Sequence, residues 1–250
     1  MKAIWEKCEK EDFSYLSTVL DSYVSFTNDR KRKELLEKSD KCEKSKDELI
    51  QIVDEQIRYY GSSDFAYLKR MLFSDDGGVN ALEVVEDVCD KLGVKIKKGG
   101  SLEARLERLV TSVVEKELTN KTPEQLSKSF KNIGVGDADL ELIMEHIKKN
   151  GKVAILPILA QILGPKITLG IIETIIVSLI AQIVGREAAK QLVKELMKRN
   201  PWLNALGPIL WAISGVWLAI DLQGPAYRKT VPICLYLGVV ALRDGAEDEK

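Results

Sequence analysis

The ionisable side chains of this 250-residue chain are concentrated toward its N-terminus. Residues 1–152 hold 57 of the 75 Asp, Glu, Lys and Arg residues, and residues 153–250 hold only 18. A helix at a protein surface needs a polar face toward water, and the back of this chain is too poor in charge to supply one on every helix. Much of residues 153–250 must therefore face protein or lipid.

This contrast divides the sequence into a charged front, residues 1–150, and an apolar, glycine-rich back, residues 151–250. Apolar residues recur at helical spacing between turn and capping signals in the front half. The segment 122–125, Thr-Pro-Glu-Gln, is typical of a helix start with proline at the first position. We expect an all-α protein, a multi-helix bundle in which two helical domains pack together. Short β-branched runs such as 93–96 are compatible with a strand.

The expected front helices are separated by glycine, proline and acidic turns. Ser45 and Glu48 predict a capping box that opens a helix ending at Tyr60. Before it, residues 29–44 are so rich in Lys, Glu and Asp that we expect a solvated helix or a linker. A turn is predicted at 74–78. The other front helices are expected at residues 3–8, 11–24, 64–73, 80–92, 101–118, from 122 onward and at 137–151.

The apolar segments of the back half approach the length of a membrane span. Ile167–Gly185 has about the 20 residues that a bilayer requires, but it contains Glu173. Trp202–Ile220 is interrupted by a Gly-Pro pair, and Val153–Gly164 is too short. Three arrangements stay open: helices of a buried core, an apolar hairpin at 153–185 that leaves the bundle and enters lipid on a trigger, and a constitutive span.

The sequence lacks catalytic and metal-binding motifs. Its one histidine, His146, and its widely spaced cysteines give no His/Cys metal set. No phosphate-binding glycine loop, nucleophile elbow or zinc-protease motif occurs. We therefore expect no metal, no cofactor and no enzymatic activity. The net charge of −1 and the lack of aromatic residues among the basic runs argue against nucleic acid as a partner.

Two features bear on localisation. The N-terminal residues 1–16 lack the apolar stretch of a cleaved signal peptide. The four cysteines have no CxxC spacing and are typical of apolar packing residues in a reducing compartment. We expect a cytoplasmic protein, with peripheral association to the inner membrane through internal segments as the alternative.

The most distinctive local segment is Gly224–Pro232, GPAYRKTVP, which sets polar residues between two apolar stretches. We predict that Arg228 pairs with Glu173 or Asp221 in a buried polar network. The alternative is a phosphate or carboxylate headgroup bound at a helix start near Thr230, in a helix expected at 231–243. The candidate ligand-binding or partner-binding residues are Tyr227, Arg228, Lys229, Thr230, Glu173 and Asp221.

This segment, with the apolar helix after it and Leu242-Arg243, resembles the C-terminal signature of the YaaW family of uncharacterised bacterial proteins. The stretch from Tyr59-Tyr60-Gly61 to Leu92-Gly93-Val94-Lys95, with the helix after Ser101, is similar to that family in order and spacing. The family is grouped with the ubiquinol–cytochrome c chaperones, which assist assembly of a respiratory membrane complex. The resemblance implies a bacterial helical protein with a chaperone-like role, and it carries over no catalytic residue.

The leading functional expectation is a non-enzymatic interaction or chaperone-like protein at or near the bacterial inner membrane. Its partner would be a protein or membrane lipid, bound by Gly224–Pro232 and the apolar hairpin. One alternative is a colicin-like, membrane-active effector whose hairpin 153–185 inserts into lipid. Another is an enzyme or carrier for a lipid or small apolar ligand, which requires an apolar pocket near Arg228 and Glu173.

Overall fold

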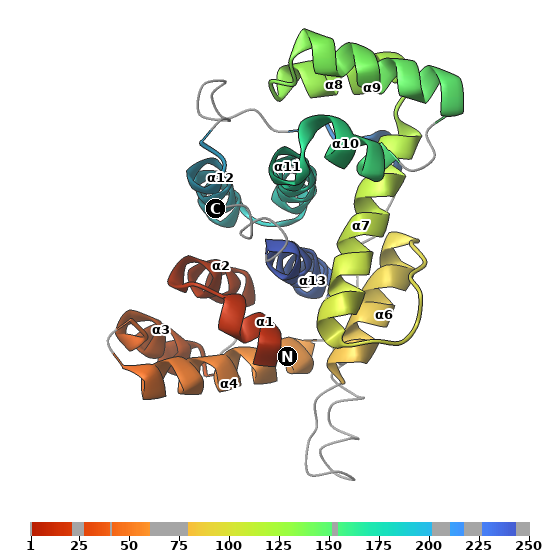
Figure 1. The fold of residues 1–250 in the computed structure, drawn as a ribbon. Helices are drawn as coiled ribbons and strands as arrows, with labels where there is room; N and C mark the ends of the chain where they lie inside the picture. Colours follow the sequence, from red (N-terminus) through yellow and green to blue (C-terminus); the bar gives the residue numbers. More distant parts are fainter. Residues whose placement is uncertain are drawn as a thin grey trace.

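A computed structural model gives the fold of most of the chain (Figure 1). Within the residues that it describes, the chain forms twelve α-helices, one short 3-10 helix and no strand. The predicted all-α class is confirmed. The helix expected at 64–73, the turn at 74–78 and Asp221 lie outside the described part of the chain. The described residues are 2–21, 28–40, 42–60, 80–151, 155–201, 211–217 and 227–243.

Local sequence signals set the ends of several front helices. The Thr122 hydroxyl accepts from the Gln125 amide at 3.3 Å, and the Gln125 side chain accepts from the Thr122 amide at 2.9 Å, so this predicted capping box is confirmed. Asn80 and Ser101 cap the two helices before it. The front helices are α1 Lys2–Lys7, α2 Lys10–Leu20, α3 Asp29–Lys38, α4 Glu43–Tyr60, α6 Ala81–Leu92, α7 Leu102–Asn120, α8 Pro123–Asn132 and α9 Asp137–Asn150.

Two expectations for the charged stretch 29–44 are corrected. The stretch is no single solvated helix or linker: α3 ends at Lys38 and α4 begins at Glu43. Ser45 therefore lies inside α4, and the capping box predicted for it is wrong. The charged residues of this stretch were expected to face water. One of them, Arg32 on α3, is instead fully buried and helps to hold α3 against α4.

The back half contributes the helices at the centre of the molecule. Its last helix begins at Tyr227 rather than at 231, so the GPAYRKTVP polar residues form its first turn and Pro232 lies inside it. The run 93–96 forms no strand. The back helices are α10 Ile155–Leu163, α11 Pro165–Ile183, α12 Arg186–Arg199, the 3-10 helix Gly215–Trp217 and α13 Tyr227–Ala241.

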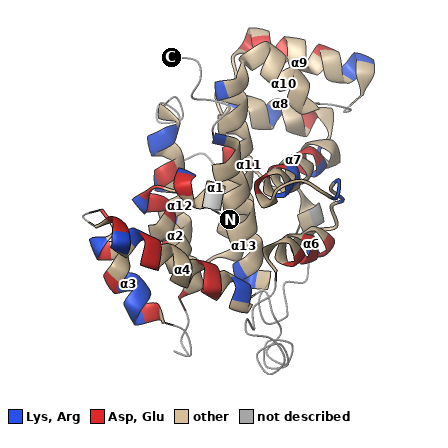
Figure 2. Cartoon of the chain, turned by 60° about the horizontal axis from the view of Figure 1, so that its bottom comes forward, with Lys and Arg blue, Asp and Glu red and all other residues tan. Residues whose placement is uncertain are grey.

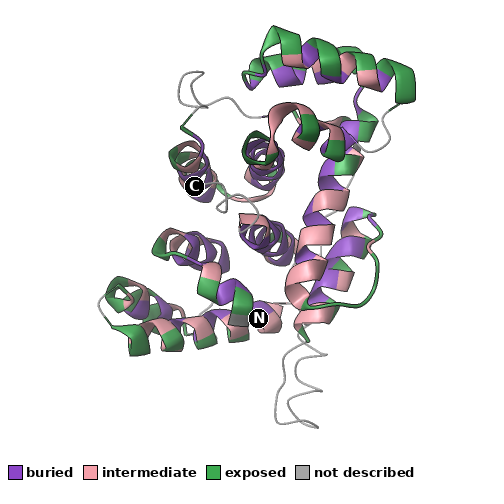
Figure 3. Cartoon of the chain, in the orientation of Figure 1, coloured by how far each residue is buried: buried purple, intermediate pink, exposed green. Residues whose placement is uncertain are grey.

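The middle of α11 and most of α13 are enclosed by other helices. Helix α13 contacts α1, α2, α4, α6, α7 and α11, and α11 contacts α7, α10, α12 and α13. Residues 170–180 and 230–241 are buried throughout (Figure 3). Charged side chains lie along α3, α4 and α6, whereas α11 and α13 carry few (Figure 2). The apolar back of the chain thus faces protein, and both halves contribute to one core.

The two halves of the chain approach closely where α13 crosses α7. A Cβ atom added at Gly238 would lie 2.4 Å from Val110 Cγ2 and 2.6 Å from the Leu106 carbonyl oxygen. Only glycine allows the two backbones to approach this closely. The domain boundary at residues 150 and 151 stays a prediction, and the core that α7 and α13 share crosses it.

One helix in the described part of the chain, α11, is long and apolar enough to cross a membrane. Its apolar stretch is 67% buried inside the protein. A core helix of a soluble protein has the same length and composition, so this feature is weak evidence for a span.

Candidate functional site

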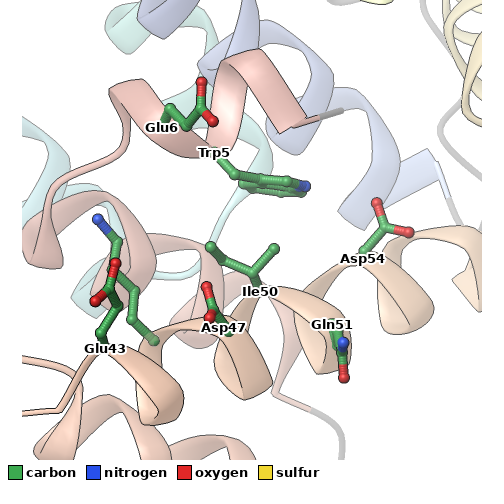
Figure 4. Close-up of a pocket in the computed structure, with 8 residues that line it drawn as sticks. Trp5, Glu6, Glu43, Asp47, Ile50, Gln51 and Asp54 are labelled. Carbon is green, nitrogen blue, oxygen red and sulfur yellow. The ribbon is translucent and has the colours of Figure 1, made fainter.

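A groove of about 700 Å³ lies between α1 and α4. This volume falls in the range of known ligand sites. The groove has two walls because α1 crosses above α4 and both helices project side chains into the space between them (Figure 4). Its lining residues are Trp5, Glu6, Glu43, Lys46, Asp47, Ile50, Gln51 and Asp54.

The middle of the groove is apolar. The Trp5 ring extends from α1 over the side chain of Ile50 on α4 (Figure 4). Trp5 is held from behind by Phe13, with ring centroids 6.0 Å apart and planes 27° from parallel. Ile50 is partly buried and packs against the core. Trp5 is only 3% exposed, so the apolar middle of the groove is itself packed into the core of the protein.

The ends of the groove are acidic. Glu43 and Asp54 lie at opposite ends of the apolar middle, with Asp47 between them along α4 (Figure 4). Glu6 adds a carboxylate from α1, and Lys46 is the one cation among the lining residues. The groove therefore carries an excess of negative charge and favours a cationic ligand.

A separate cluster of buried ionic groups lies where α2, α11, α12 and α13 meet. Asp12 on α2 is fully buried. Its Oδ1 accepts from the Tyr236 hydroxyl at 2.5 Å and from Arg199 Nη2 at 3.1 Å, and its Oδ2 accepts from Arg243 Nη1 at 3.0 Å. Burial raises the pKa of the Tyr236 phenol above its ordinary value. These contacts tie the front helix α2 to the back half.

Glu173 joins the same cluster from α11. Its Oε2 accepts from Asn200 Nδ2 at 2.5 Å, and its Oε1 lies 4.0 Å from Arg243 Nε. Burial raises the pKa of the Glu173 carboxyl above its ordinary value, because desolvation disfavours the charged form. The cavity beside it has a volume of about 20 Å³, enough for about one water molecule and too small for an organic substrate.

Glu117 on α7 organises a second buried polar cluster. Its carboxylate accepts from Trp211 Nε1 at 2.9 Å, from Trp217 Nε1 at 2.8 Å and from the Ser214 hydroxyl at 2.6 Å. Lys121 Nζ lies 3.3 Å away. These contacts fix the segment 211–217 of the back half against α7. Glu117 is fully buried, so its acceptor capacity is used within the fold.

Arg32 on α3 forms a third cluster, also fully buried. Its guanidinium donates to Asp21 Oδ1 and to Asp29 Oδ1, each at 2.6 Å. It also donates to the Ser17 hydroxyl at 2.9 Å and to the Gln56 side chain. The residues come from α2, α3, α4 and the chain after α2. The cluster therefore fixes the front helices that support the groove.

The polar residues of the GPAYRKTVP segment, Tyr227 to Thr230, lie in the first turn of α13. Lys229 Nζ donates to the carbonyls of Leu20 and Asp21 at 2.8 and 2.9 Å and lies 3.9 Å from the centre of the Tyr60 ring. Lys91 Nζ lies 4.5 Å from the centre of the Tyr227 ring.

Arg228 and Thr230 also lie in the first turn of α13, and Glu173 lies far from them. Thr230 is buried and Arg228 is exposed. The predicted pairing of Arg228 with Glu173 is wrong, because Arg228 lies in the first turn of α13 and Glu173 lies beside Arg243, just past the other end of that helix. A helix of 15 residues separates them by about 22 Å. Whether the segment binds a ligand stays a prediction.

Sequence reasoning also missed residues that the structure brings together. Trp5 and Ile50 are far apart in sequence, and the groove between them had no local signal. Glu117 lies on an ordinary amphipathic helix. No group of three or more His, Cys, Asp and Glu side chains within the described ranges could hold a metal ion.

No protein-family model matches the chain, and no solved structure matches it. The chain is similar to three UPF0174 proteins of Helicobacter pylori. The first is 26% identical over 202 residues, covering 79% of this chain and 74% of the relative. The others are 25% identical over 192 residues, covering 76% and 87%, and 24% identical over 196 residues, covering 78% and 88%. These relatives support the expected relation to an uncharacterised bacterial family.

Proposed function

We propose that this chain is a non-enzymatic interaction protein with a chaperone-like role, which holds a segment of a partner protein in the groove between α1 and α4. The observation that carries the proposal is the groove itself. It is large enough for several side chains and has carboxylates at both ends of a middle formed by the buried Trp5 and the partly buried Ile50. Such a surface can bind an amphipathic segment without any chemical step.

The buried ionic groups support a binding role over a catalytic one. Asp12, Glu117 and Arg32 are each fully buried and engaged by side chains from other helices. The cavity at Glu173 is too small for a substrate. These groups stabilise the arrangement of helices, and a general acid or base would instead need hydrogen-bond reach to a bound substrate.

We include a location and a family in the proposal. The protein would work in the cytoplasm, at or near the bacterial inner membrane, and would belong to the YaaW family. The similarity to bacterial UPF0174 proteins supports a bacterial setting. The length and composition of α11 give weak support to membrane proximity. Fractionation of the untagged protein with carbonate and detergent washes tests the location, and full recovery in the soluble fraction would exclude the membrane.

The experiment that tests the binding role is photo-crosslinking in cells. A benzophenone amino acid replaces Lys46 in the groove, and a matched variant carries it at the exposed Leu142 on α9. We expect one identifiable partner protein to be crosslinked from position 46 and lost when Ile50→Glu disrupts the groove. Equal crosslinking from both positions, or none from position 46, would contradict the proposal.

A second candidate is the membrane-active effector. The observation that favours it is the pair α10 and α11, which contact each other and are joined through Gly164 alone. In this function the hairpin 153–185 would leave the bundle and insert into lipid. Leakage of dye-loaded anionic vesicles that disappears when Ile176→Lys places a charge in α11 would support it. The enzyme or carrier alternative stays a prediction; within the described residues, Arg228 and Glu173, which were expected to converge on its pocket, lie at different ends of α13.

A further inference from the structure

We propose that α12 is a hinged cover of α11, which opens as a unit while α11 and the other helices stay folded. The inference goes beyond the proposed function and does not depend on the α1–α4 groove. Three features of α12 lead to it: its few buried side chains, its polar contacts with α2 and the incompletely paired groups beneath it.

Few side chains of α12 are buried. Four of its 14 residues are buried, and one of the four is the carboxylate-bearing Glu195. The other three are Ala188, Leu192 and Leu196. In α11, by contrast, every residue from 170 to 180 is buried. Because buried apolar surface supplies most of the stability of a helix within a protein, α12 is held less firmly than α11.

Helix α12 meets α2 through polar side chains. It lies at the edge of the molecule, with α11 and α2 as its neighbours (Figure 1). Gln191 Nε2 donates to the Ser14 hydroxyl at 2.8 Å. Lys198 Nζ lies 3.1 Å from Glu11 Oε1, and these two side chains are 60% and 37% exposed. Water can replace such contacts, so they oppose the opening of α12 only weakly.

The ionic groups beneath α12 lose little when it leaves. Glu195 Oε2 and Arg243 Nε are buried and make no hydrogen bond with any described residue, so opening returns both atoms to water. Asp12 loses Arg199 as a donor and keeps Tyr236 and Arg243. The cavity of about 20 Å³ among α11, α12 and α13 also lies here, so the packing beneath α12 is incomplete.

The joint between α11 and α12 allows the movement. It consists of Val184 and Gly185, both in extended conformation, and a Cβ atom added at Gly185 would meet nothing within 4 Å. A rotation at this glycine moves α12 without unwinding α11. At the other end of α12, Asn200 donates to Glu173 at 2.5 Å, and entering water can take over this bond.

Opening of α12 uncovers the face of α11 that carries Val177. Helix α11 keeps its own backbone hydrogen bonds in this state, so its amides stay protected while its side chains become accessible. The membrane-active function would require this step before the hairpin 153–185 could leave the bundle.

The test measures how fast a disulfide reagent modifies a cysteine placed beneath α12 in the full chain. Val177→Cys places a thiol in the cavity that α12 covers. The matched control, Ile175→Cys, replaces a buried residue on the opposite side of α11, about 200° around the helix. Both are made together with Cys42→Ser, because Cys42 is exposed. The buried natural Cys234 reports global unfolding in the same sample.

We expect the thiol at position 177 to be modified at least about tenfold faster than Cys234, and the thiol at position 175 to react no faster than Cys234. Raising the salt concentration tenfold should speed modification at position 177 by about threefold, because salt screens the exposed pair of Lys198 and Glu11.

A variant of the α2–α12 contact tests what holds the cover closed. Gln191→Ala with Lys198→Ala should speed modification at position 177 by about fivefold, since it removes a hydrogen bond and an ion pair to α2. The matched control is Glu187→Ala with Lys190→Ala, which removes an exposed ion pair within α12 and should leave the rate unchanged.

Three results would overturn the inference. Equal rates at position 177 and at Cys234 would mean that α12 leaves only when the whole protein unfolds. Equally fast modification at positions 175 and 177 would mean that α11 itself opens. An unchanged rate at position 177 in the Gln191→Ala, Lys198→Ala variant would mean that the polar contacts with α2 do not hold the cover.

Discussion

The substitution Gly238→Ala tests the contact between the two halves of the chain with a single methyl group. In the folded protein this methyl would lie 2.4 Å from Val110 Cγ2 and 2.6 Å from the Leu106 carbonyl oxygen. Carbon atoms pack at about 3.5–4.0 Å. The valine side chain has no free space to rotate away in a close-packed core, and the carbonyl belongs to the backbone of α7. Helices α7 and α13 must therefore move apart.

Two effects of opposite sign set the change in the free energy of unfolding that Gly238→Ala causes. Alanine favours a helix over glycine by about 1 kcal/mol. Overpacking of a core costs about 1–3 kcal/mol. Because a backbone atom is involved, we expect a cost near the upper end, and the net change in the free energy of unfolding is a loss of about 2 kcal/mol.

Urea unfolding followed by circular dichroism measures this loss. The matched control is Gly215→Ala, since a Cβ atom there would meet nothing within 4 Å. We expect the control to change stability by less than about 0.5 kcal/mol. An increase in the stability of Gly238→Ala by about 1 kcal/mol would mean that only the helix preference operates, and would refute the close packing of α7 against α13.

Three further predictions concern buried groups and thiols. Glu117→Ala should lower the free energy of unfolding by about 3–5 kcal/mol in urea titrations, because it leaves two indole donors and the Lys121 ammonium buried without their partner. Burial raises the pKa of Glu173 above its ordinary 4.5, so the ionised carboxylate opposes folding. Glu173→Gln should therefore be more stable than the natural protein at pH 8, with a difference that shrinks as the pH falls to about 4.5; a difference that grows on acidification would contradict this. Cys42 is exposed and hydrogen bonds from Ser45 lower its pKa, so a disulfide reagent at neutral pH should modify it first. The three buried thiols, whose pKa values are raised to about 11 or 12, should react only after unfolding: Cys8, Cys89 and Cys234.

Composition predicted that the back helices avoid water, and it left open whether protein or lipid covers them. Helix α11 carries only Lys166 and Glu173, so water cannot wet it on all sides, and the structure encloses it between helices. Helix starts with strong local signals, such as Thr122, were also predictable because the capping residues contact their own helix.

The features that could not be predicted depend on contacts between distant segments. Arg228 was predicted to pair with Glu173, but Arg243 lies beside Glu173 instead, because of how α13 runs past α11. Gly238 appears in sequence as one glycine among 17. Its role follows only from the position of α7. The groove could not be predicted from the sequence either, because Trp5 and Ile50 meet only after α1 folds onto α4.

Hydrogen exchange of the backbone amides in lipid-free buffer tests most directly whether the charged front of the chain covers its apolar back. We predict that amides of α11 and α13 are among the slowest in the protein and exchange only through global unfolding, with the same opening free energy as amides of α7. Exchange of α11 as rapid as that of the exposed helix α9 would contradict the account, because it would mean that these apolar helices open to solvent while the remainder of the protein stays folded.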